Sequence, residues 1–162
     1  MNDIRTVWNS PVVGAYLLWR FVLGYRQQAG GFPNMALAFP AVSILMQPQF
    51  TDELSPRMHS LEGFVKKLID KNKRGYLNDL GNDIREHKDF VLAVIETAVV
   101  LEMVSVNYED GTLETLRKEP KELEKFAADF RKEMGGKAGA LGKCFGSETA
   151  DRVCNLLGVY FS

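Results

Sequence analysis

The first third of the chain is dominated by apolar residues. Residues 12–25 contain one charged side chain, Arg20, and they follow Ser10 and Pro11. Serine caps helices and proline suits the first helical position, so we predict a helix from residue 11 to about residue 27, ending before Gly30-Gly31. Its apolar positions fill more than the face of roughly 100° that a surface helix normally buries. We therefore expect this helix to be covered on more than one side.

A second apolar segment occupies residues 35–46. It contains Pro40, which removes a helical hydrogen bond and disfavours helix at the residue before it, so we predict a short helix or turn and then a second helical piece. Residues 47–56 are polar, contain two prolines and are interpreted as a connector. Each apolar stretch is shorter than the roughly 20 residues that cross a bilayer, so we expect core helices and no membrane contact.

From residue 55 the pattern becomes amphipathic. We predict a capped helix over residues 60–69, a short helix near residues 76–80, and a long helix from Asp83 to about Met103. The alternating residues that follow turn at Asp110-Gly111, a pairing typical of a β-hairpin.

Two further helices are predicted near the end of the chain. The first covers about residues 121–134 and is expected to end at Gly135-Gly136, and the second covers residues 150–157. The predicted fold class is therefore mainly α. We expect a single helical domain over residues 1–162, with an apolar helical part (1–50), a winged-helix-like unit that includes the one β-hairpin (55–116), and C-terminal helices (120–162).

Composition and charge exclude several classes of partner. The net charge of −1 provides no global basic field for nucleic acid, and the apolar fraction of 46% lies in the globular range. The first ten residues lack the basic flank and cleavage site of an export signal. The two cysteines are interpreted as reduced thiols of a cytoplasmic protein.

Candidate catalytic chemistry is sparse. His59 and His87 are the only histidines, and neither has a second ligand at metal-binding spacing. The glycines at positions 135–146 do not follow a buried strand, and Lys143 is followed by Cys144 rather than serine or threonine, so we interpret them as a helix end and a flexible connection rather than a phosphate loop. We predict no enzymatic activity, cofactor, metal or small-molecule substrate. An enzyme that uses Cys144 is the catalytic alternative.

A local basic cluster gives a nucleic-acid alternative. Its members are Lys66, Lys67, Lys71, Lys73 and Arg74. The order of helices and hairpin matches a winged helix in which the helix from Asp83 would read DNA. Residues 90–103, however, offer only Glu96, Thr97 and Glu102 as polar groups, whereas base reading needs Arg, Lys, Asn or Gln. A winged helix used for protein contacts fits better, and a small DNA-binding regulator is the alternative function.

Several segments resemble one protein family in the same order. They are Asn9-Ser10-Pro11, residues 17–25, residues 39–45, Ser60-Leu61, the helix from Arg85, the hairpin, and residues 156–159. The sequence is similar to the middle components of bacterial three-component ABC-ATPase systems, a group that includes the small third subunit of Lamassu-type antiphage defence. The resemblance covers nearly the whole chain and rests on apolar, structural motifs. It carries no expectation for the basic cluster.

The resemblance implies a non-enzymatic adaptor that links an SMC-like ABC ATPase to an effector, commonly a nuclease. The protein would then meet DNA only indirectly, through the complex, with the basic cluster as the possible nucleic-acid contact. Because Trp, Tyr and Arg dominate interface energies, the candidate protein contacts are Trp8, Tyr16, Trp19, Arg20, Phe21 and Tyr25. These side chains could equally fill the core of the domain itself, and the apolar helix could also pack against a second copy. Arg20 is the most informative, because a lone guanidinium in an apolar helix is either paired internally or reaches a partner.

Overall fold

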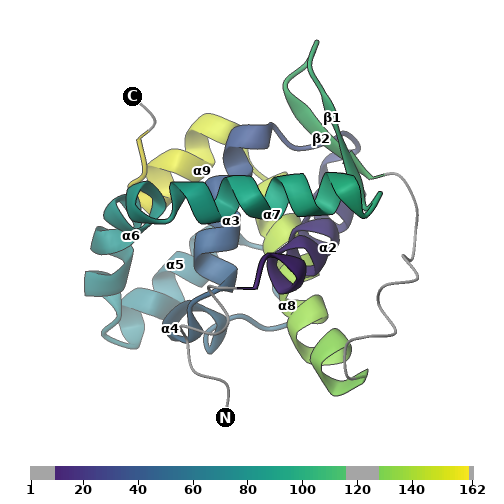
Figure 1. Cartoon of the computed structure of the whole chain (residues 1–162). Helices are drawn as coiled ribbons and strands as arrows, with labels where there is room; N and C mark the ends of the chain where they lie inside the picture. Colours follow the sequence, from purple (N-terminus) through teal and green to yellow (C-terminus); the bar gives the residue numbers. More distant parts are fainter. Residues whose placement is uncertain (1–9, 116–127, 161–162) are drawn as a thin grey trace.

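The computed structural model describes residues 10–115 and 128–160 (Figure 1). Its elements in chain order are α2 (Pro11–Ala29), η1 (Met35–Leu37), α3 (Ala38–Leu45), α4 (Pro48–Thr51), α5 (Leu61–Asp70), α6 (Arg74–Glu86), α7 (Lys88–Val100), β1 (Val104–Asn107), β2 (Thr112–Thr115), α8 (Ala128–Gly146) and α9 (Ala150–Leu157). The mainly α fold class is confirmed, and within the described residues the strands form one antiparallel hairpin.

Helix α2 is the element around which the others pack. It begins at Pro11 and ends at Gly30, whose left-handed backbone (φ 79°) lets its N–H donate to the Arg26 carbonyl. Helices α3, α7 and α8 all contact it, and most of its residues between Gly14 and Gly24 are buried. The prediction that this helix is covered on more than one side is confirmed, and the cover comes from the chain itself.

Helix α8 overturns the predicted break at Gly135-Gly136. It runs without interruption to Gly146. A Cβ atom at Gly142 would lie 2.7 Å from the amide nitrogen of Tyr25, and one at Gly24 would overlap the backbone of Gly139. The glycines therefore serve close packing of α8 on α2, which outweighs their poor helix propensity, and the interpretation as a flexible connection is wrong.

The helix predicted from Asp83 to about Met103 is divided. Helix α6 extends from Arg74 to Glu86, well beyond the predicted short helix, and α7 covers Lys88–Val100. The one-residue interruption is His87, whose Nδ1 lies 3.0 Å from the Asp83 carbonyl oxygen. A side chain bonded to the turn before it competes with regular helix at this point. The winged-helix interpretation, which was based on the order of these elements, stays a prediction.

Local hydrogen bonds and a glycine close the turn of the hairpin. The Asn107 Oδ1 atom accepts hydrogen bonds from the Glu109 and Asp110 amides at 3.0 and 3.2 Å, and Gly111 adopts φ 69° to close the turn.

The predicted connector over residues 47–56 contains the short helix α4. The predicted last helix is confirmed as α9, which is capped by Thr149 and ends at the left-handed Gly158.

Candidate functional site

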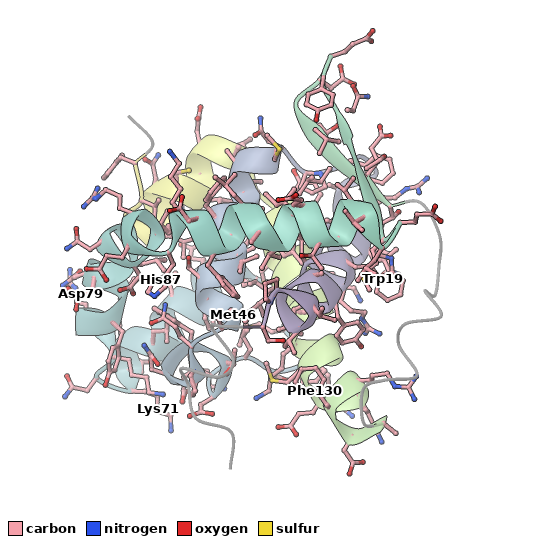
Figure 2. The ribbon with its side chains drawn as sticks, in the orientation of Figure 1. Trp19, Met46, Lys71, Asp79, His87 and Phe130 are labelled. Atoms are coloured by element: carbon pink, nitrogen blue, oxygen red, sulfur yellow. The ribbon has the colours of Figure 1, made fainter. Side chains whose placement is uncertain are left out.

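Three of the predicted contact residues lie inside the fold. Tyr16, Trp19 and Phe21 belong to α2 and are all buried, and Figure 2 labels Trp19 on this helix. The Tyr16 hydroxyl donates to the Arg131 carbonyl of α8 at 3.2 Å, and the Phe21 ring meets Phe145 edge-on at 5.1 Å between centroids. These side chains therefore occupy the core of this chain, which was the alternative stated for them. Trp8 lies outside the described residues.

Arg20 and Tyr25 are the half-buried members of the set. The Arg20 guanidinium lies over α8, since its carbon is 3.5 Å from a Cβ position at Gly135 and its Nη2 is 3.8 Å from one at Gly139. Within residues 10–115 and 128–160, no hydrogen bond or ion pair engages this guanidinium. Arg20 is thus held against the protein, and no anionic partner lies beside it among the described residues.

Arg20 lines a hollow of about 370 Å³. We call it the α2–α8 hollow; its lining residues are Arg20, Leu23, Gly24, Gln27, Pro56, Gly136, Gly139, Ala140 and Lys143. Two cations and one amide line it, and the described lining includes no carboxylate. Such a set favours an anionic group, and a guanidinium can hold a carboxylate through two parallel hydrogen bonds.

Lys73 differs from the other residues of the predicted basic cluster, because it has partners within the fold. The Lys73 ammonium donates to the Gln49 carbonyl at 3.0 Å and contacts Glu53 Oε1 at 3.4 Å, and Glu53 is only 8% exposed. Lys73 therefore compensates a buried carboxylate within the fold. By contrast, Lys66, Lys71 and Arg74 are exposed and Lys67 is half-buried.

Within the described structure, neither cysteine is an activated thiol. Burial raises the pKa of the Cys144 thiol to about 12, so this thiol is protonated at neutral pH. Burial, followed by the nearby charge of Asp151, also raises the pKa of Cys154. Among the residues that the structure describes, no group of three or more His, Cys, Asp or Glu side chains is arranged to hold a metal.

The sequence pattern did not predict that Arg20 and Lys143 line one hollow. The two residues are far apart along the chain, and Lys143 was placed in a supposed flexible connection. The signal in the sequence was the spacing of the glycines before Lys143, because small residues at helical spacing indicate that a second helix packs closely there. Only the packing of α8 on α2 brings both cations to one hollow.

Comparison with known families decides the class of protein. A family model described as ABC-three component (ABC-3C) system Middle Component 3 matches residues 2–161. The chain belongs to this family. The match confirms the resemblance to middle components of three-component ABC-ATPase systems and includes every residue of the α2–α8 hollow. No curated protein and no solved structure matches the sequence. In the described part of this middle component, no helix is both long and apolar enough to span a membrane.

Proposed function

We propose that this middle component is a non-enzymatic, cytoplasmic adaptor that links an SMC-like ABC ATPase to an effector nuclease in a bacterial antiphage or anti-plasmid defence complex. Family membership supports a role as one component of a multi-component system. The observation that carries the adaptor role is the α2–α8 hollow, where Arg20 and Lys143 lack an acidic partner within the described residues.

The electrostatics of the hollow favour an acidic side chain of a partner. A half-buried guanidinium loses part of its hydration, and two nearby cations raise the local positive potential. A carboxylate that enters the hollow would accept hydrogen bonds from Arg20 and offset part of the positive charge of Lys143. Hydrogen bonds to charged groups contribute about 1.5–3 kcal/mol, enough to anchor a protein contact.

A non-enzymatic role agrees with the chemistry of the described residues. The Cys144 thiol is buried in the protonated state, and Lys143 lines the hollow rather than activating it. DNA would be reached through the ATPase. The surface of α7 includes Asp89 and Glu96, whose charges oppose phosphate. A DNA-binding regulator is therefore not the function that the described surface favours.

The adaptor role is tested by capturing the other two components of the system on the tagged protein. The variants are Arg20→Gln and the double variant Arg20→Gln with Lys143→Gln. Arg85→Gln is the matched control, because Arg85 is an exposed arginine on α6, outside the hollow. We expect the wild type and the control to capture both components.

We expect Arg20→Gln to weaken capture of one component by about 10-fold or more, the equivalent of roughly 1.4 kcal/mol. The double variant should weaken it further. Failure of the wild-type protein to capture either component would overturn the adaptor role. Equal capture by Arg20→Gln and wild type would overturn the assignment of the hollow as a docking site. Denaturation of each variant shows whether its fold is retained.

A further inference from the structure

Helix α7 has an apolar face that no described element covers. Its inner side packs into the core through Val91, Val94, Ile95 and Ala98. On its other side Leu92, Val99 and Val100 are 45%, 39% and 72% exposed. These three residues and Glu96 share one side of the helix, because positions i, i+4, i+7 and i+8 lie above one another. We call this set the α7 outer face.

The α7 outer face and the α2–α8 hollow lie on different helices and share no residue. Figure 1 shows α7 in the foreground, crossing α2. A Cβ atom at Gly14 of α2 would meet the Val94 side chain of α7, whereas Gly24 of the same helix packs on Gly139 of α8. Helix α2 therefore contacts α7 and α8 at different positions along its length, and two partners could occupy the two surfaces together.

The charges on the α7 outer face indicate what kind of partner fits. Glu96 lies midway between Leu92 and Val100, and no ion pair engages it within the described residues. Asp89 and Glu102 are also exposed, near the two ends of the helix, and the exposed Lys88, one turn before Leu92, is the basic residue on the same side. A second copy would bring together two surfaces that each carry three acidic residues and one basic residue, and like net charges at a contact are unfavourable. The charge distribution therefore favours a different chain with basic residues.

We propose that the α7 outer face is a second docking surface, and that it binds an amphipathic helix from one of the other two components of the system. Apolar side chains of that helix cover Leu92, Val99 and Val100, and a lysine or arginine lies opposite Glu96. This inference rests on the proposed adaptor function and deepens it, since an adaptor needs one surface for each partner. The mode of recognition is an apolar helix stripe held in register by a charge pair.

The test measures the affinity of the full chain for each of the other two components separately. The variants are Leu92→Glu, which places a charge in the apolar face, and Glu96→Lys, which reverses its charge. Ile69→Glu is the matched control, because Ile69 on α5 is also 45% exposed but lies away from α7. We expect Leu92→Glu and Glu96→Lys each to weaken binding of the same component by about 10-fold or more, while Ile69→Glu binds as wild type.

The outcomes separate this inference from the adaptor function. If the wild-type chain binds neither component, the adaptor function fails. If it binds both and the two α7 variants bind equally well, only the α7 docking surface is overturned. Sedimentation of the chain alone provides a further readout: self-association abolished by Leu92→Glu would show a second copy as the occupant and overturn the proposed partner. Unchanged denaturation midpoints for the variants establish that lost binding reflects the surface and not the fold.

Discussion

Replacement of Gly142 by alanine tests the close contact between α2 and α8. A Cβ atom at this position would lie 2.7 Å from the Tyr25 amide nitrogen and would overlap the Phe21 carbonyl oxygen. Both neighbours are backbone atoms of α2, so no side-chain rotation relieves the overlap. Ordinary contact begins near 3.4 Å, and α8 would have to move away from α2 by at least about 0.7 Å.

The size of the effect follows from two opposing terms. Alanine is favoured over glycine inside a helix by about 0.5–1 kcal/mol, whereas overpacking a well-packed contact costs about 1–3 kcal/mol. Gly139→Ala is the matched control on the same helix, because its Cβ would meet Arg20 Nη2 at an ordinary 3.8 Å. Both variants gain the same helix propensity when glycine becomes alanine. The difference between their free energies of unfolding therefore isolates the packing cost at position 142, which is about 1–3 kcal/mol.

Urea denaturation of the two variants and the wild type measures this difference. We expect Gly139→Ala to be as stable as the wild type or up to about 1 kcal/mol more stable, and Gly142→Ala to be less stable than both. If Gly142→Ala were as stable as Gly139→Ala, the two helices would not be in the contact described, and the reasoning about the glycines would be refuted.

Two further predictions concern titratable groups. Burial raises the pKa of the Asp83 carboxyl above its ordinary value of 3.8. The folded chain therefore holds the carboxyl proton more tightly than the unfolded chain does. The free energy of unfolding falls as pH rises from 3.8 through the raised pKa of the folded state. Asp83→Asn should therefore gain stability relative to the wild type between pH 3 and pH 7 in denaturation experiments; an unchanged difference at the two pH values would contradict this. A thiol reagent at pH 8 should label the half-buried Cys154 at least 10-fold faster than the buried Cys144, because access and ionisation both limit the reaction; equal labelling rates in the native protein would contradict the burial.

Local chemistry explains which elements could be predicted from the sequence. Helix α2 begins at Pro11 and ends at Gly30 because proline and glycine have strong preferences at those positions, and Gly158 ends α9 for the same reason. The hairpin follows from its turn residues in the same way. By contrast, the glycines of α8 are poor helix formers whose value appears only when α2 is beside them, and no local pattern contains that information.

The candidate surfaces depended even more on tertiary packing. The sequence singled out Arg20 because it is the one charged residue in the apolar stretch 12–25. It is half-buried and has no internal partner in the described structure. Its neighbour Lys143 could be identified only from the packing of α8. Helices α2 and α7 are both apolar on several sides, but α2 is enclosed by the chain whereas Val100 of α7 is 72% exposed. Periodicity alone does not decide which apolar helix is central and which is peripheral.

The central claim is that this middle component bridges two others through separate surfaces. The most direct measurement is the mass of the complexes formed by the ATPase and the effector, mixed with and without this protein. We expect the ATPase and the effector to be found in one complex only when the wild-type protein is present. Arg20→Gln and Leu92→Glu should each lose a different component, so that a different two-component complex persists in each case. Association of the ATPase with the effector to the same extent in the absence of this protein would contradict the account.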